Sequence, residues 1–255
     1  MNPVLRSRLR VVLAPLVFGV LAIALWQWFV TARNIQPYVL PSPSAIWEQF
    51  TGSIDIIRDA AITTAKNALL GLLIGTFFGV VCAALAAAIR PIEQMAAPTV
   101  VALSVIPIVA LAPVLYAMFG AAAQTGRVLV AAIAAFVPVY INALRGLRTV
   151  LPIHRDLMRS YAATGWQATR SVTLPGAVPF IFTGIRIASS VAVISALIAE
   201  YFGGPLDGLG ISITSAVSSS RYSLAWAFVL GSVVIGLLFY CVTYALEALV
   251  TRHRA

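Results

Sequence analysis

The sequence predicts an all-α protein that crosses a membrane six times. Of its 255 residues, 61% are hydrophobic and only 10% are charged, and the mean hydropathy is +0.97. A soluble domain carries about 25% charged residues. Six apolar stretches each reach the length of about 20 residues that a span needs. The composition therefore indicates one polytopic membrane domain, with no room for a soluble catalytic domain beside it.

The six predicted spans are residues 11–31, 61–89, 95–119, 127–144, 178–200 and 224–250. Three arginines precede the first span, as in a signal peptide, but its apolar run of about 20 residues exceeds the 7–15 of a signal peptide, so we expect a retained anchor. Pro107 and Pro113 interrupt the third span, which predicts a kinked helix. The two cysteines, Cys82 and Cys241, fall inside apolar spans and are interpreted as packing residues rather than a disulfide.

The segments on the predicted outer side have their own patterns. Ser42 and Pro43 are a cap and first-turn pair that opens an amphipathic surface helix, whose apolar residues are Ile46, Phe50, Ile54 and Ile57.

In the second span, three glycines spaced four residues apart predict close helix packing, within the chain or at a dimer interface; they are Gly71, Gly75 and Gly79. Lys66 and Asn67, which begin that span, are interpreted as interfacial. The stretch YFGGPLDGLG at 201–210 predicts turns leading to a short outer segment.

Charge sets the orientation. The net charge of +9 raises the question of nucleic acid, but the basic residues lie in short loops between apolar spans, so topology explains them better. With the N-terminus inside, the inner segments hold eleven arginines and the outer segments five basic residues. We therefore expect residues 1–10 and 251–255 to be cytoplasmic, and 145–177 to be a cytoplasmic loop.

The predicted loop 145–177 is about 33 residues long, whereas connections between helices have a median of about 4–6 residues. Pro152 is expected to begin a short helix, Gly165 to permit a break, and Leu174-Pro175 to end a second short helix. Two short helices joined by a bend would form a docking knob for a partner protein. The alternative is an ordinary solvated linker.

Three segments resemble one family. They are SYAATGWQATRSVTLPGAVPFIFTGIRIA at 160–188, VLPSPSAIW at 39–47 and EYFGGPLDGLG at 200–210. In this order, with six spans, they resemble the permease subunits of type I, binding-protein-dependent ATP-binding-cassette (ABC) importers, in the branch for nitrate, sulfonates, taurine and thiamine-pyrimidine precursors. That family has a cytoplasmic EAA loop, with the pattern E-A-A-x-x-x-G, nine further residues, and I-x-L-P.

Anchored on Leu174-Pro175, the pattern places Asp156 at its Glu, Leu157 and Met158 at its alanines, Ala162 at its Gly and Val172 at its Ile. Only Leu-Pro is identical. The resemblance implies a MetI-like fold and a loop that docks on an ATPase. The residues implied in this docking are Asp156, Leu157, Met158, Ser160, Tyr161, Ala162, Ala163, Thr164, Gly165, Trp166, Leu174 and Pro175.

The resemblance also implies the partners: two ABC ATPase subunits that bind the ATP, an extracytoplasmic substrate-binding protein, and a second permease in a homodimer, all at a bacterial inner membrane. The segments EYFGG and DLMRSY resemble the pyrimidine-precursor and related vitamin-type members somewhat more than the sulfonate members. Sulfonate, taurine or nitrate permeases are the alternative.

Polar residues on the fifth span are candidates for a translocation pathway, because polar groups are costly in lipid. Arg186, Ser189, Ser190, Val193 and Glu200 lie near one line of a helix. Arg186 and Glu200 would be about 21 Å apart, so they cannot pair on that helix. The alternative places both charges at the membrane interfaces.

Motifs for other functions are missing. The sequence has no G-x-x-x-x-G-K-[ST] phosphate loop, no H-E-x-x-H or cysteine cluster for a metal, and no G-x-S-x-G. His154 and His253 are expected to be solvated. A self-sufficient channel or secondary transporter would often show inverted repeats or acids at the bilayer centre, and neither is evident. A transport subunit without catalytic residues of its own is therefore favoured over an intramembrane enzyme.

Overall fold

The computed structural model describes residues 3–120, 122–149 and 152–252, and every regular element in these ranges is a helix. The outermost residues of both predicted cytoplasmic ends, with His253, and residues 150–151 of the predicted loop lie outside them. The elements are α1 Pro3–Ala32, α2 Pro43–Gly52, α3 Ile54–Ala88, α4 Arg90–Val105, α5 Ile108–Phe119, α6 Thr125–Arg148, α7 Pro152–Ser160, α8 Gly165–Ala168, the π-helical η1 Thr169–Thr173, α9 Leu174–Tyr201, α10 Leu209–Ser218 and α11 Tyr222–Arg252.

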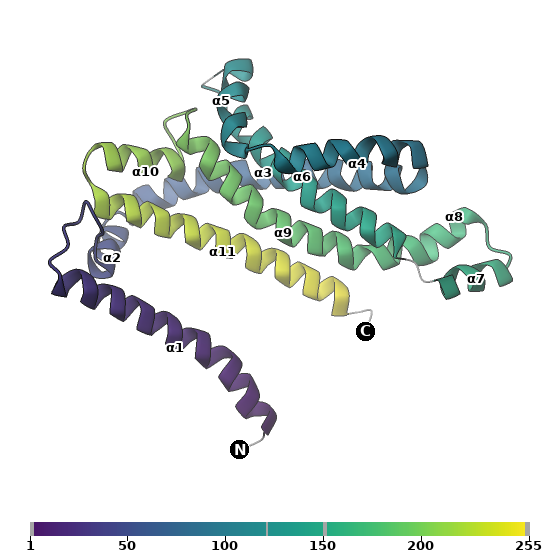
Figure 1. Cartoon of the computed structure of the whole chain (residues 1–255), viewed down its shortest axis with the longest axis horizontal. Coiled ribbons are helices and arrows are strands. Elements are labelled where there is room, and N and C mark those ends of the chain that lie inside the picture. Colours follow the sequence, from purple (N-terminus) through teal and green to yellow (C-terminus); the bar gives the residue numbers. More distant parts are fainter. Residues whose placement is uncertain (1–2, 121, 150–151, 253–255) are drawn as a thin grey trace.

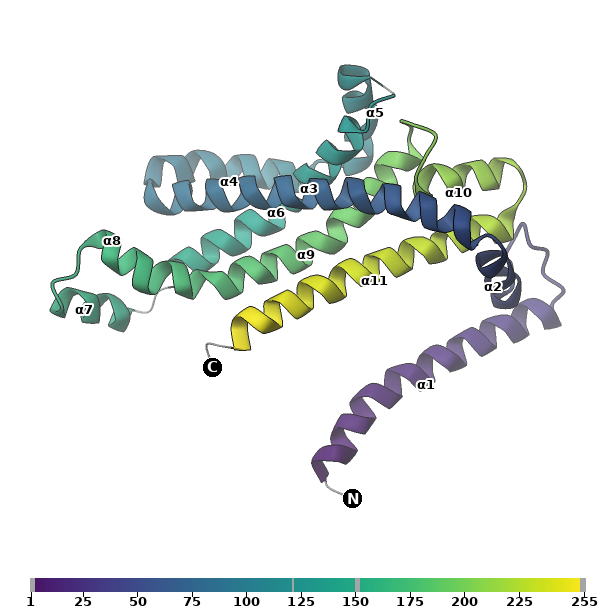
Figure 2. The ribbon, with the colours of Figure 1, turned by 180° about the vertical axis from the view of Figure 1, so that it is seen from behind.

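Five of these helical segments are long and apolar enough to cross a membrane, and the bent pair α4–α5 makes a sixth if it counts as one span. The all-α, six-span class predicted from composition is thereby confirmed. In the bundle, α6 packs between α3 and α9, and α11 packs along α9 (Figure 1). Helices α7 and α8 lie at one end, and α2 and α10 lie at the opposite end (Figures 1 and 2).

Helix α1 stands apart from the bundle, connected through α2 (Figure 2). Only 6% of its spanning window is buried, against 50% for α6. Its apolar side chains therefore face the membrane or another subunit rather than this chain. At its end, Gln27 accepts a hydrogen bond from the Ser44 backbone at 3.1 Å. This contact ties α1 to the start of α2.

The three evenly spaced glycines of α3 lie against α6 of the same chain. A Cβ added at Gly71 would lie 2.4 Å from the Cβ of Ala131, and one at Gly75 would lie 2.5 Å from the Ala132 carbonyl oxygen. A Cβ added at Gly79 would lie 3.0 Å from the Cβ of Val139. The sequence correctly predicted close packing, and the packing is within the chain rather than at a dimer interface.

The third predicted span is broken rather than kinked. Helices α4 and α5 meet at an angle of 104°. Ile106 and Pro107 between them are both extended, with ψ of 124° and 112°. Proline disfavours helix in the residue before it, so the chain turns at Pro107. Pro113, by contrast, lies inside α5 without ending it.

The surface helix predicted to run on from Pro43 is also divided. The Ser42 hydroxyl accepts a hydrogen bond from the Ala45 backbone and Pro43 opens α2, as expected. However, Ser53 leaves the helical conformation, with φ −120° and ψ 23°. Helix α3 therefore begins at Ile54, seven residues before the start predicted from hydropathy, because its first turns are amphipathic rather than wholly apolar.

Leu174-Pro175 does not end a helix, contrary to the prediction. Helices α8, η1 and α9 form one continuous segment, Gly165–Tyr201, of 37 residues. The π-helical turn Thr169–Thr173 comes just before the proline, and the Leu174 N–H bonds back to Thr169. A π-turn changes the register of the backbone hydrogen bonds, so the helix passes a proline that would otherwise interrupt it.

Candidate functional sites

The predicted docking knob is present as two helices that project from one end of the bundle. Helix α7 begins at Pro152, as expected, and α8 follows after a four-residue turn (Figure 1). Large apolar side chains on this knob are open to solvent: Ile153 is 70% exposed, Tyr161 is 74% exposed and Trp166 is 68% exposed. Exposed aromatic residues gathered on a projecting element are typical of a protein-binding surface.

The break in the knob lies at Tyr161–Thr164, before Gly165 rather than at it. Ala162 has φ +51°, a left-handed conformation that glycine adopts most easily. Thr164 then caps α8: its hydroxyl accepts a hydrogen bond from the Gln167 backbone, and the Gln167 side chain accepts one from the Thr164 backbone at 2.7 Å. This capping box fixes the start of α8.

The remaining residues of the predicted docking set lie around this turn. Asp156 forms an exposed ion pair with Arg159 at 3.4 Å. A groove of about 360 Å³ separates α7 from α8 and η1, and Met158, Ala163 and Gly165 are among the residues that line it. Leu157, Ser160 and Tyr161 are exposed on or just after α7, whereas Leu174 and Pro175 begin α9. No partner chain is present, so the docking role stays a prediction.

The predicted pathway line on α9 is largely enclosed by the chain itself. Ser189 and Glu200 are fully buried, Val193 is 3% exposed, and Ser190 is half-buried. The Glu200 carboxylate accepts hydrogen bonds from the Thr64 hydroxyl at 2.8 Å and the Gly210 backbone at 3.0 Å. The geometry thus gives Glu200 a structural task, and a role in the pathway is still a prediction.

Arg186, at the other end of that line, has a partner that the sequence did not reveal. Its Nε lies 3.1 Å from one carboxylate oxygen of Glu247 on α11. The other carboxylate oxygen of Glu247 accepts a hydrogen bond from the Thr183 hydroxyl at 2.6 Å. The guanidinium lies 5.8 Å from the centroids of both the Tyr240 and Tyr244 rings. These contacts join α9 to α11, and charge compensation explains how an arginine is tolerated there.

A second polar cluster, at the α10 end of the bundle, was missed entirely. The Arg127 side chain is fully buried, donates to Asp207 at 2.7 Å and to the Pro205 carbonyl, and contacts Gln124. Gln124 in turn accepts a bond from Asn67 at 3.0 Å. The cluster fixes the Gly-rich turn between α9 and α10 onto α6 and α3. Asn67 is therefore a packing residue with a specific partner.

Comparison with known proteins shows a family that this chain matches. The family described as "Binding-protein-dependent transport system inner membrane component" matches residues 75–253. A probable ABC transporter permease protein of Haemophilus influenzae is 30% identical over 91% of this chain and 94% of its own length. The riboflavin transport system permease protein RibX of Chloroflexus aurantiacus is 30% identical over 92% of this chain and 88% of its own length.

The fold has a similar counterpart among solved structures. A chain from the crystal structure of an amino acid ABC transporter with histidines superposes with a TM-score of 0.66. The superposition covers 77% of this chain and 95% of the solved chain, at 21% sequence identity. Its likeness supports the predicted MetI-like fold.

Proposed function

Because this chain belongs to the family of binding-protein-dependent transport system inner membrane components, we propose that it forms half of a solute pathway powered by partner ATPases. In this proposal two copies of the chain line the pathway across a bacterial inner membrane, with both termini cytoplasmic. Two ABC ATPases bind the ATP and take up the α7–α8 knob. An extracytoplasmic binding protein delivers the solute, and this chain itself catalyses no reaction.

The observation that carries the proposal is the construction of the knob. Its apolar side chains project from the bundle, and its second helix is continuous with α9 through Tyr201. A partner that moves α8 would therefore act on α9 directly, because no loop separates the two helices. The left-handed Ala162 lies where the EAA pattern has its glycine, and this supports the alignment despite its few identities.

The partnership is tested by purifying the tagged chain from its native host after mild cross-linking, and identifying the proteins retained by mass spectrometry. We expect an ABC ATPase in the complex, and a binding protein when the solute is present. If the chain forms transport-active homo-oligomers in liposomes without any ATPase, it is a channel or secondary transporter and the proposal is wrong.

The knob is tested by three substitutions at one position. Ala162→Trp should abolish solute-stimulated ATPase activity of the purified complex, because a bulky residue would be both strained at φ +51° and too large for a docking cleft. Ala162→Gly should retain the activity, since glycine adopts this conformation freely. Insertion and yield of the chain are measured alongside and should not change.

Ala162→Asn separates the two causes of the expected loss. Asparagine tolerates the left-handed region but is larger than alanine. If strain alone matters, Ala162→Asn should couple normally, and if docking is close, its coupling should fall towards that of Ala162→Trp. Normal coupling in Ala162→Trp would contradict the placement of this turn in an ATPase cleft.

For the solute, the relatives favour two different classes. In the vitamin-type class, the riboflavin permease above and a formylaminopyrimidine permease of Halalkalibacterium halodurans are each 30% identical to this chain. In the sulfonate class, an aliphatic sulfonate permease of Bacillus subtilis is 29% identical. Such small differences in identity do not separate a vitamin precursor from a sulfonate. The solute is thus a small polar molecule of one of these classes, and its charge is the property that distinguishes them.

A further inference from the structure

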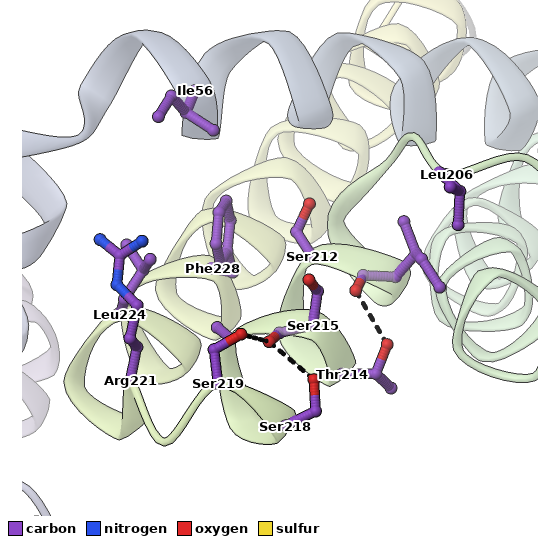
Figure 3. Close-up of a pocket in the computed structure, with 12 residues that line it drawn as sticks. Ile56, Leu206, Ser212, Thr214, Ser215, Ser218, Ser219, Arg221, Leu224 and Phe228 are labelled. Atoms are coloured by element: carbon purple, nitrogen blue, oxygen red, sulfur yellow. Dashed lines mark hydrogen bonds between the residues drawn. The ribbon is translucent and has the colours of Figure 1, made fainter.

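The first turns of α11 are packed against several other helices. Leu224 and Phe228 are buried and, with Ile56 of α3 and residues of α10, line a groove of about 610 Å³ (Figure 3). A Cβ added at Gly231 would lie 2.9 Å from a methyl carbon of Ile57 on α3. Helix α2 packs against α11 at the same end (Figure 1). This end of α11 is therefore fixed by contacts on several sides.

The last turns of α11 are attached in a different way. Within the described residues 240–252, Thr243 is the only one that is buried. These turns run beside α9 and away from α1 (Figures 1 and 2). The stripe of α11 that faces the bundle continues at four-residue steps through Ile235, Phe239, Thr243 and Glu247. It is apolar up to Phe239 and polar beyond, so the attachment of this end depends on polar side chains.

Both polar residues of the stripe are paired with α9. The Thr183 hydroxyl donates to one carboxylate oxygen of Glu247 at 2.6 Å, and the Arg186 Nε lies 3.1 Å from the other oxygen. About one helical turn away, the hydroxyls of Ser189 and Thr243 lie 3.1 Å apart. These five residues form what we call the α9–α11 seam. Two of them, Arg186 and Ser189, belong to the line predicted for the pathway.

The ion pair makes the seam hard to separate. The side chains of Arg186 and Glu247 are 26% and 15% exposed, and the surrounding helices are apolar. Pulling the two apart would leave both charges uncompensated where water has little access. The guanidinium also lies 5.8 Å from the ring centroids of Tyr240 and Tyr244, which adds cation–π attraction to the same helix. Arg186 thus binds three residues of α11.

We propose that the α9–α11 seam is a strap that makes the last turns of α11 move together with α9. When a partner displaces the knob, and α9 with it, α11 pivots about its first turns, which stay packed against α3 and α10. Arg186 and Glu247 are positioning residues in this movement. The inference rests on the proposed function for the source of the movement, whereas the attachment of α11 to α9 does not depend on it.

The attachment is tested without an ATPase, by the distance between two spin labels in the full chain in nanodiscs. The labels are placed at the exposed positions Ile194→Cys on α9 and Leu246→Cys on α11, with Cys82 and Cys241 replaced by alanine. Double electron–electron resonance should give a narrow distance distribution in this parent chain, because the seam holds the two helices in one arrangement.

Glu247→Gln should broaden that distribution, because Arg186 loses its charge compensation. Exchange of the charges, Arg186→Glu with Glu247→Arg, should make it narrow again. Ser189→Ala should broaden it less, since one neutral hydrogen bond is lost. Ser190→Ala is the matched control and should have no effect, because this hydroxyl forms no side-chain hydrogen bond among the described residues. Equal widths in the parent chain and in Glu247→Gln would overturn the proposal.

The movement is tested in the complex with the ATPase that co-purifies, using a third label at the exposed position Leu85→Cys on α3. On ATP binding, the distances from Leu85→Cys to Ile194→Cys and to Leu246→Cys should both shift, and the distance between the latter two should not. With Glu247→Gln, the α3–α9 shift should persist and the α3–α11 shift should be lost. The charge exchange should restore the α3–α11 shift, which a purely structural contact would not produce.

The outcomes separate the strap from the proposed function. If ATP shifts α9 relative to α3 but leaves α11 in place, the strap is wrong and the proposed function stands. If neither helix shifts although the ATPase is bound, the proposed function and the strap are both wrong.

Discussion

At the scale of single residues, Arg127 shows how this chain keeps charge inside an apolar bundle. It is the largest side chain that is fully buried in the described ranges, whereas its partner Asp207 is 47% exposed. Arg127 therefore depends on the ion pair for charge compensation more than Asp207 does. Asp207 without Arg127 would still be solvated, but Arg127 without Asp207 would leave a buried charge uncompensated.

This asymmetry predicts unequal effects of two substitutions. Asp207→Asn should destabilise the folded chain by about 3 kcal/mol, at the lower end for a broken buried ion pair because Asp207 is half solvated. Arg127→Met, which removes the buried charge at similar volume, should cost less, and the double variant should resemble Arg127→Met. The measurement is thermal unfolding in detergent, with Asp55→Asn, an exposed acid, as control. A larger loss from Arg127→Met than from Asp207→Asn would contradict the burial argument.

The sequence could not reveal this pair, for a physical reason. The two residues are 80 positions apart, and Arg127 opens a predicted span, where an arginine is normally an interfacial residue. Glu247, the partner of Arg186, was missed for the same reason, since it lies in the last turns of the final span. Composition and hydropathy predict which segments enter the membrane, but not which side chains meet there.

At the scale of helices, close contact between α3 and α6 depends on glycine. A Cβ at Gly75 would come within 2.5 Å of the Ala132 carbonyl oxygen, which is backbone and cannot rotate away. Gly75→Ala should therefore force α3 from α6 and destabilise the chain by about 1–3 kcal/mol, the usual cost of overpacking. The measurement is the midpoint of thermal aggregation, followed by size-exclusion chromatography.

Gly19→Ala in α1 is the matched control for this substitution. Nothing lies within 4 Å of a Cβ added there, and alanine is the better helix former. The midpoint should stay the same or rise. If Gly75→Ala is as harmless as Gly19→Ala, α3 and α6 are not in the close contact that the structure describes.

The four-residue spacing predicted this packing from sequence, because small residues on one helix face have few other uses. The ends of helices were predicted less well. A proline broke the chain at Pro107 but was passed at Pro113 and at Pro175, where η1 adjusts the backbone. Proline affects the backbone hydrogen bonds locally, and whether the helix continues is decided by the turns packed around it.

At the scale of the whole molecule, one continuous helical segment joins the knob to the opposite end of the bundle. The helix from Gly165 to Tyr201 has 37 residues and is about 55 Å long along its axis at 1.5 Å per residue. It begins in the knob and ends at Glu200, which holds the first turn of α10. Movement of the knob by an ATPase would thus reach the start of α10 along one helix, with no loop between them.

This continuity predicts the effect of a flexible insertion. Two glycines inserted between Thr173 and Leu174 should uncouple the two ends, because glycine removes the stiffness of the helix. The readout is labelling of Leu206→Cys, a 91% exposed position in the turn between α9 and α10, in a chain whose Cys82 and Cys241 are replaced by alanine. In the uninterrupted chain the labelling rate should change on ATP binding to the partner ATPase. With the insertion it should not, although the ATPase still co-purifies. The same insertion after Asn34, between α1 and α2, should leave the response intact, and an ATP response that survives the insertion before Leu174 would show that the signal travels by another helix.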